Sequence, residues 1–225
     1  MKSFARFTLA SSFALAATLL AAQPQAATAS KPTLALVGGQ VIDGYEGPPI
    51  RDGVVLIAGE RIVAVGSRSE VNVPPGTPII NTEGMSVLPG LMDMHVHLMI
   101  LGHADYEHWD KTYMSRFRDE IMPVAAKQLL MAGVTTVREL GAPLEDILEV
   151  KRRIEKGVIP GPRLFVSGPF IQKAPYFEYE KFVRWGVDGP DDARAKVQKL
   201  VDAGVDFIKL IDQDQMTDAD RKSVV

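Results

Sequence analysis

Two histidines separated by one residue are the feature of this sequence that most directly suggests chemistry. His95 and His97 close the apolar run Leu91 to His97, which has the length and composition of a buried β-strand. Side chains alternate along a strand, so a spacing of two places both imidazoles on one face. Neutral imidazole is a common ligand of zinc and other divalent ions. The pair indicates a metal site, although two polar residues with water or backbone partners would show the same spacing.

Other polar residues lie at the ends of predicted strands or in the loops that follow them. Lys209 shares a strand face with apolar residues, where an ammonium is costly unless it is neutralised, paired or modified. Alternatively, the ammonium group of Lys209 reaches solvent or pairs with Asp212. Arg138 and Glu139 could contact a substrate carboxylate or pair across strands. His103 lies in the loop after the predicted strand Leu91 to His97. It is a candidate for the mouth of a pocket, and the alternative is a solvated loop residue.

The chain after Pro89-Gly90 alternates between short apolar strands and helical stretches, which predicts βα units around a parallel sheet. Four such units are about half of the ~250 residues of a closed (β/α)₈ barrel. We therefore expect an α/β fold in which residues 89–225 form the amino-terminal half of a TIM-type barrel, truncated and inactive alone. The predicted strands are Leu91 to His97, Val134 to Leu140, Arg163 to Ser167 and Val205 to Ile211, with helix faces marked from Leu144 to Val158 and from Ala193 to Val201.

Residues 30–88 have a different pattern, in which short Val- and Ile-rich runs are separated by Gly and Pro turns. Val54 to Ala58 and Arg61 to Val65, joined by Gly59-Glu60, predict a hairpin with a two-residue loop. This section is expected to be a small β-sandwich domain.

The first 29 residues are typical of a secretory signal peptide. Lys2 and Arg6 precede sixteen uncharged residues, and Ala27-Thr28-Ala29 has the small-x-small pattern of a cleavage site. A membrane anchor is the alternative, but the run is shorter than the ~20 apolar residues of a span. We expect a periplasmic or secreted protein with no stable membrane anchor after cleavage.

Composition narrows the chemistry further. The chain has no cysteine, which excludes thiolate metal sites, disulfides and a cysteine nucleophile. Its formal net charge of −3 offers no basic field for nucleic acid, so a nucleic-acid partner is not expected. Any metal must bind through histidine, carboxylate or a less usual ligand.

The stretch from Val87 to His97 resembles the first-strand signature of the amidohydrolase superfamily, metal-dependent hydrolases on a (β/α)₈ barrel. Three further stretches are similar to its imidazolonepropionase-like branch, which includes Xaa-Pro dipeptidases. These stretches are Ala132 to Gly141, Gly161 to Gly168 and Asp206 to Leu210. The resemblance runs from about Leu34 to the last residue.

The resemblance implies a set of roles for the site. His95 and His97 would be metal ligands, and Lys209 would carry a carbamate that bridges two divalent ions, expected to be zinc. Arg138 and His103 are candidates for substrate contact from their positions in the chain alone. In this superfamily, histidines from strands five and six and a general-base aspartate from strand eight complete the site. That aspartate is expected beyond the chain end, so no catalytic base can be named. The loop from Lys173 to Glu180 departs from the Gly-Gly-His stretch expected after strand three, which leaves the substrate class open.

The expected function is hydrolysis of an amide or peptide-like C–N bond, in a dipeptide or N-acyl amino acid, by a metal-activated water. Two alternatives remain. One is lactone or phosphotriester hydrolysis at the same site, and the other is a non-catalytic exported protein. The partners expected are a small-molecule substrate and a second copy of the chain joined through open sheet edges.

Overall fold

The computed structural model of the 225-residue chain describes residues 30–100, 105–173, 178–212 and 215–223. It divides into two compact units, Met1–Val87 and Leu88–Val225, which are described separately. The predicted signal peptide and His103 lie outside the described residues. Within these ranges, no helix combines the length and the apolar character that crossing a membrane requires.

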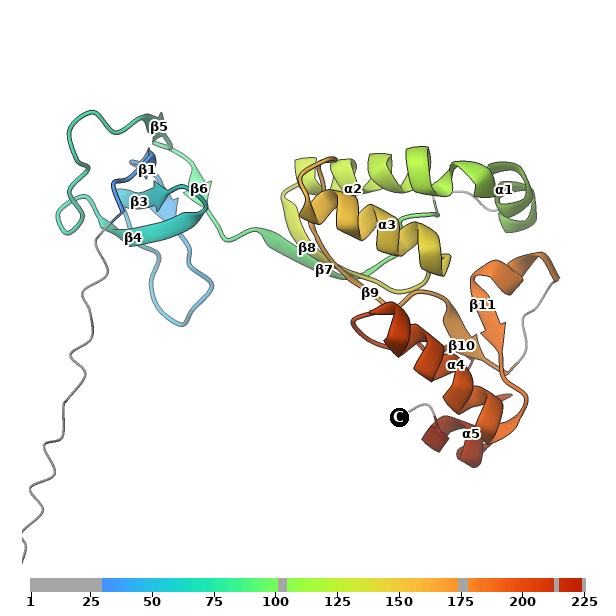
Figure 1. Ribbon diagram of the computed structural model, residues 1–225. Helices are drawn as coiled ribbons and strands as arrows, with labels where there is room; N and C mark the ends of the chain where they lie inside the picture. Colours follow the sequence, from blue (N-terminus) through green and yellow to red (C-terminus); the bar gives the residue numbers. More distant parts are fainter. Residues whose placement is uncertain (1–29, 101–104, 174–177, 213–214, 224–225) are drawn as a thin grey trace, which may run out of the picture. The chain divides into compact units, whose positions relative to one another are not determined.

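The first unit is built from short strands around a small apolar core. Its main sheet has the order β4-β3-β1-β5, and β2 pairs with β6 in a separate two-stranded sheet (Figure 1). The predicted hairpin is confirmed, because β3 and β4 are antiparallel neighbours joined at Gly59-Glu60. The packing of the two sheets as a sandwich stays a prediction. The strands are β1 (Leu34–Val37), β2 (Gln40–Val41), β3 (Gly53–Ala58), β4 (Arg61–Ser67), β5 (Ile79–Asn81) and β6 (Ser86–Val87).

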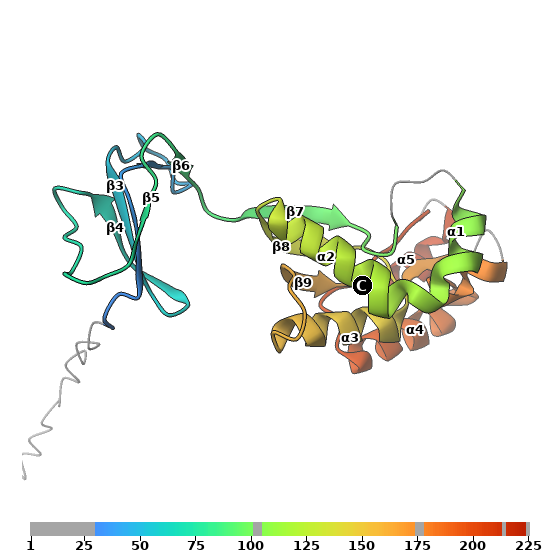
Figure 2. The same ribbon diagram turned by 90° about the horizontal axis from the view of Figure 1, so that it is seen from above.

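The second unit contains a parallel sheet of order β7-β8-β9, as the alternation of strands and helices predicted. Helices α2 and α3 lie side by side over one face of this sheet (Figures 1 and 2). A parallel pair, β10 and β11, follows β9. The elements are β7 (Leu91–Val96), α1 (Tyr106–Tyr113), η1 (Met114–Arg116), η2 (Phe117–Ile121), α2 (Met122–Met131), β8 (Val134–Glu139), α3 (Leu144–Glu155), β9 (Arg163–Val166), β10 (Phe170–Gln172), η3 (Glu178–Phe182), β11 (Arg184–Gly186), α4 (Gly189–Ala203) and α5 (Asp218–Ser223).

The two faces of the β7-β8-β9 sheet differ in burial. Val137, Leu164 and Val166 alternate along β8 and β9 and pack into the core formed with α2 and α3. On the opposite face, Met92 is 69% exposed and Phe165 is 39% exposed. The helices therefore determine which residues of each strand are buried. The polar residues His97 and Glu139 lie at the carboxyl ends of β7 and β8.

The predicted strand from Val205 to Ile211 is wrong in its extent. The segment runs parallel to β10, but only Leu210 forms a bridge, with Ile171. The reason lies in its neighbour, since the chain between β9 and β10 turns at Gly168, whose φ is +66°, and Pro169 has no N–H to donate. Regular pairing cannot continue past this break.

A side chain replaces part of the missing pairing. The Val166 N–H donates to Asp206 Oδ2 at 2.7 Å, while the Asp206 N–H donates to the Val166 carbonyl at 2.8 Å. Asp206 also forms an ion pair with Lys151 on α3, with an Nζ to Oδ2 distance of 2.6 Å. The segment that carries Lys209 is thus anchored to both β9 and α3.

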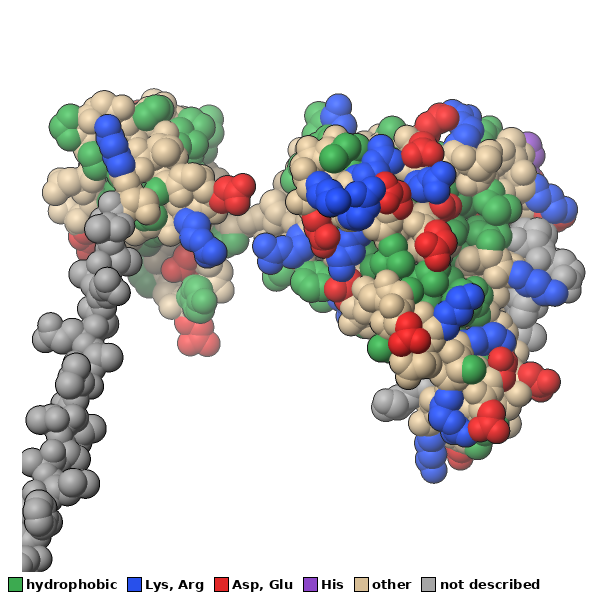
Figure 3. All heavy atoms as spheres, viewed as in Figure 1, with side chains coloured by type: hydrophobic (Ala, Val, Ile, Leu, Met, Phe, Trp, Pro, Cys, Tyr) green, Lys and Arg blue, Asp and Glu red, His purple; other side chains and the backbone are tan. Residues whose placement is uncertain are grey.

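The surface of the second unit mixes both signs of charge. Figure 3 shows basic and acidic side chains interspersed on the face in view. Several of them form pairs within one helix, such as Arg152 with Glu149 on α3. Exposed pairs of this kind contribute little to stability, because water and salt screen the two charges. This surface is consistent with the balanced composition of the chain.

Candidate functional site

His95 and His97 lie close together at the end of β7. Their ring centroids are 5.3 Å apart, at an interplanar angle of 69°. The pairing of β7 with β8 shifts register between Asp93 and Val96, and Asp93 Oδ1 accepts the His95 N–H at 3.0 Å. A register shift of this kind aims side chains differently from a regular strand, and such irregularities are common beside active sites. The predicted common face is therefore present, with a local distortion that alternation alone did not predict.

The ring of His97 is held on two sides. Its Nδ1 lies 3.3 Å from the Gly141 carbonyl oxygen, and its centroid lies 5.6 Å from that of Phe170. A carbonyl oxygen can only accept a hydrogen bond, so Nδ1 carries the proton and Nε2 keeps its lone pair. This is the tautomer in which Nε2 can bind a metal ion.

The surroundings of His97 favour the neutral imidazole. Burial lowers its pKa most strongly, and the positive charges of His95, Lys209 and Arg184 lower it further. The hydrogen bond to the Gly141 carbonyl opposes these effects and raises the pKa. A neutral ring binds metal, whereas an imidazolium has no free lone pair, so the site is prepared for a ligand role near neutral pH.

Lys209 is brought near the histidines, since its charge contributes to the lowered pKa of His97. Its carbonyl oxygen accepts the Ile171 N–H at 2.9 Å, which places its backbone beside β10. Three residues later, Asp212 has a φ of +50°, a left-handed conformation that aspartate adopts more readily than most residues. His95, His97 and Lys209, which the sequence predicts as ligands, thus lie near one another in the fold.

Arg138 and Glu139 point to opposite faces of β8. The Arg138 guanidinium carbon lies 4.4 Å from the Phe207 ring centroid, in a hollow of about 300 Å³ on the sheet face opposite α2 and α3. Glu139 is fully buried and forms no ion pair with any described residue, so cross-strand pairing is wrong for this carboxylate within the described chain. His108, the remaining described histidine, is exposed on α1.

A cavity of about 440 Å³ adjoins His97 and contains several groups that the sequence reasoning missed. Arg184 forms an ion pair with Glu180 at 3.2 Å, and its guanidinium carbon lies 5.1 Å from the Phe170 ring centroid. These residues come from η3, β10 and β11, a region with no clear periodicity. The one available signal was the i, i+4 spacing of Glu180 and Arg184. The lining residues are His97, Met99, Ile100, Tyr106, Asp110, Phe170, Glu180, Val183, Arg184 and Ile211.

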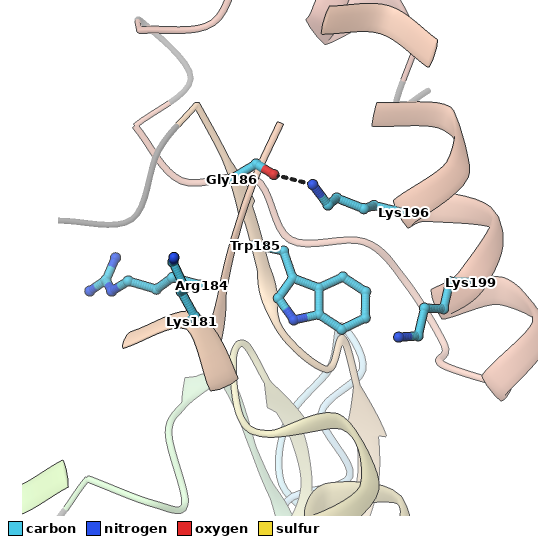
Figure 4. A pocket seen from close by; sticks show the side chains of 6 residues that line it. All are labelled: Lys181, Arg184, Trp185, Gly186, Lys196 and Lys199. Carbon is cyan, nitrogen blue, oxygen red and sulfur yellow. Dashed lines mark hydrogen bonds between the residues drawn. The ribbon is translucent and has the colours of Figure 1, made fainter. Parts of the chain in front are cut away.

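A second hollow, of about 410 Å³, lies between β11 and α4 (Figure 4). Trp185 forms part of its wall, with the Lys199 Nζ 4.9 Å from the ring centroid. Lys196 donates to the Gly186 carbonyl and to Asp192. Apart from Arg184, this hollow shares no lining residue with the cavity beside His97. Among the described residues that line it, none is a predicted site residue.

The donor set fits part of a divalent-metal site. Two imidazoles lie together, and the described residues contain no group of three or more His, Asp or Glu side chains that could hold a metal ion. Catalytic zinc sites use three protein ligands and keep one position open. His95 and His97 would supply two nitrogen ligands, and Lys209 is the nearby side chain that carboxylation would convert into an oxygen donor.

Comparison with known proteins shows several relatives of this chain. An imidazolonepropionase from Alkaliphilus oremlandii (strain OhILAs) is 43% identical over 61 residues, which cover 26% of this chain and 14% of that protein. The solved structure of molinate hydrolase matches with a TM-score of 0.69 and 26% identity, covering 80% of this chain and 45% of that one. A putative prolidase from Bifidobacterium longum matches with a TM-score of 0.68 and 26% identity, covering 85% and 45%.

The matches share two features. This chain spans less than half the length of each of the three proteins. The Amidohydrolase family itself matches residues 86–221, a range that includes His95, His97 and Lys209. The chain therefore belongs to the amidohydrolase superfamily.

Proposed function

We propose that this chain carries the first metal ligands of an exported amidohydrolase that cleaves an amide or peptide-like C–N bond. The observation that supports this most directly is the pair of imidazoles at the carboxyl end of β7, 5.3 Å apart, with His97 held as a neutral ring. Members of this family generally use divalent metal ions. A dipeptide substrate is suggested by the putative prolidase among the structural matches, and an N-acyl amino acid presents the same type of C–N bond.

The roles of this chain's residues follow from their chemistry. His95 and His97 would hold zinc through ring nitrogens, with the Gly141 carbonyl keeping the His97 proton on Nδ1. When bound, the metal lowers the pKa of water and polarises a carbonyl group. Arg184 lines the cavity beside His97, where its cation can orient a substrate carboxylate, although Glu180 already neutralises part of its charge. The apolar wall formed by Phe170 and Ile211 helps to exclude bulk water.

Lys209 is proposed to carry a carbamate. The ammonium first loses one proton, and the neutral amine then adds to carbon dioxide and releases a second proton, which leaves an anionic oxygen donor in place of a cationic side chain. Export to the periplasm, a cleaved signal peptide and self-association are part of the same proposal.

Metal binding by the 225-residue chain tests the central claim. In a cobalt(II) titration followed by visible absorption, His95→Ala and His97→Ala are each expected to weaken binding at least about tenfold, because each removes one of few ligands. His108→Ala is the matched control, since this histidine is exposed on α1 and should leave the titration unchanged. Equal affinity in the wild type and both site variants would contradict the proposed ligand pair.

Substrate class is tested on metal-loaded protein with dipeptides, N-acyl amino acids, lactones and phosphotriesters. Turnover of the first two classes supports the proposal. Turnover confined to lactones or phosphotriesters would move the function to ester hydrolysis. Metal binding without turnover of any of them is the result expected if residues 89–225 are inactive alone, whereas turnover of any of them would contradict that expectation.

The carbamate is tested by ¹³C NMR in labelled bicarbonate with zinc present. The wild type is expected to show a carbamate carbon signal that Lys209→Arg lacks, because a guanidinium remains protonated and cannot add to carbon dioxide. Lys199→Arg is the control, since this lysine lies beside Trp185 and outside the cavity next to His97. A signal that persists in Lys209→Arg would show that another amine is modified.

A further inference from the structure

Glu139 is a buried carboxyl group to which the proposed function assigns no role. It is the last residue of β8, and its side chain is 0% exposed on the sheet face that α2 and α3 cover. Its Oε1 atom has no hydrogen bond of regular geometry with the described residues. Burying a carboxyl group without an ionic partner carries a free-energy cost. A residue retained at that cost needs a structural or functional explanation.

The carboxyl group of Glu139 contacts two backbone amides, one next to His97 in the chain and one in the turn that binds the His97 ring. Its Oε2 accepts the Gly141 N–H at 3.1 Å. The Leu98 amide, which directly follows His97 in the chain, also stabilises the carboxylate charge. Gly141 is in turn the residue whose carbonyl oxygen lies 3.3 Å from His97 Nδ1. Glu139 thus connects the backbone that carries the ring to the backbone that orients it.

The Gly141 turn cannot easily move by itself. A Cβ atom at this position would come within 2.2 Å of the Phe170 ring, so the glycine backbone and that ring are in close contact. The Leu140 N–H donates to the Val96 carbonyl at 2.9 Å, which holds the start of the turn against β7. Phe170 also packs against the ring of His97. The carboxyl group of Glu139 completes this support from the helix side.

We infer that Glu139 is a positioning residue that fixes the Gly141 carbonyl and thereby keeps the proton of His97 on Nδ1. Groups that orient a metal-binding histidine typically change metal affinity by 10–100-fold when they are removed. The metal-affinity part of this inference rests on the proposed function, whereas the proton position of His97 is a property of the metal-free chain.

The proton position can be measured directly by long-range ¹H–¹⁵N NMR of the ¹⁵N-labelled, metal-free chain. The wild type is expected to show His97 with Nδ1 protonated. Glu139→Leu is expected to show a mixture of the two neutral tautomers, whereas Glu139→Gln should resemble the wild type because its amide oxygen still accepts the Gly141 N–H. If Glu139→Leu retains the wild-type tautomer, the inference is wrong.

Two further variants separate positioning from general stability. Asp220→Leu removes another buried carboxyl group with one unpartnered oxygen, on α5, and should leave the His97 tautomer unchanged. Glu139→Asp keeps the carboxyl group but shortens its reach to Gly141, so it should also give mixed tautomers and provides the test if Glu139→Leu does not fold. A wild-type tautomer in Glu139→Asp, or a shifted one in Asp220→Leu, would overturn the inference.

Cobalt(II) titrations then link the tautomer to metal binding. Glu139→Leu and Glu139→Asp are expected to bind cobalt about 10–100-fold more weakly, and Glu139→Gln less than threefold more weakly. A tautomer that depends on Glu139 in a chain that binds no cobalt would support the positioning role and contradict the proposed function. Cobalt binding that depends on His97 but not on Glu139 would support the proposed function and contradict the positioning role of Glu139.

Discussion

Gly141→Ala is expected to lower the free energy of unfolding of the second unit by at least about 2 kcal/mol. The new Cβ atom would lie 2.2 Å from the Phe170 ring, and the φ of +154° disfavours any residue with a side chain. Phe170 is 4% exposed and packs against His97 and Arg184, so its ring has little room to withdraw. Relief of the clash must therefore shift either the core or the turn.

The measurement is urea unfolding followed by tryptophan fluorescence. Both tryptophans, Trp109 and Trp185, lie in the second unit, so the signal reports on that unit alone. Gly157→Ala is the matched control, because its φ is +68° but no atom lies within 4 Å of the new Cβ. It should cost only about 1 kcal/mol of left-handed backbone strain. Equal losses in the two variants would show that the contact with Phe170 is not restrictive.

The second large effect is a fall in stability as pH rises through the range in which Glu139 ionises. Burial raises the pKa of Glu139 to about 8, with the Gly141 and Leu98 amides opposing the shift. In the unfolded chain the group titrates near 4.5. The folded state therefore holds a proton that the unfolded state has lost between these values. Its contribution is fully present below about pH 4.5 and is lost as pH rises toward and past 8, by an amount on the order of several kcal/mol.

The contribution of Glu139 is isolated by comparing the wild type with Glu139→Gln from pH 5 to pH 9. The comparison is needed because His97 acts in the opposite direction, since its lowered pKa makes stability fall as pH decreases. Both proteins retain His97, so its effect cancels in the difference. The free energy of unfolding of the wild type should decline relative to Glu139→Gln as pH rises. Parallel curves for the two proteins would show that Glu139 ionises normally.

Local pattern predicted the elements that carry the site. The runs ending at His97 and Leu140 and the run from Arg163 to Ser167 are strands because each is short, apolar and bounded by turn residues. The spacing of His95 and His97 predicted their common face for the same reason. These features depend on neighbours within a few residues, so a single sequence contains enough information to find them.

The missed features depend on contacts between distant segments. The pattern from Val205 to Ile211 was apolar enough for a strand, but its partner is interrupted at Gly168 and Pro169, some forty residues earlier. Arg184 reaches the cavity beside His97 only because β11 pairs with β10. Glu139 was expected to pair across strands or to contact substrate, and its burial at the end of β8, against which α2 packs, depends on the tertiary fold. No periodicity along the chain encodes these relations.

The carboxylate of Asp206 has a consequence for the order in which the second unit assembles. It accepts a hydrogen bond from Val166, 40 residues earlier, and from Lys151, 55 residues earlier. Closing such long loops is slow compared with forming local helices and adjacent βα units. During synthesis, α3 and β9 therefore emerge and pair before Asp206 is available. The Val166 amide cannot bind the Asp206 carboxylate until that residue has been synthesised. Docking of the Lys209 segment is then a late step, which joins this segment to both β9 and α3.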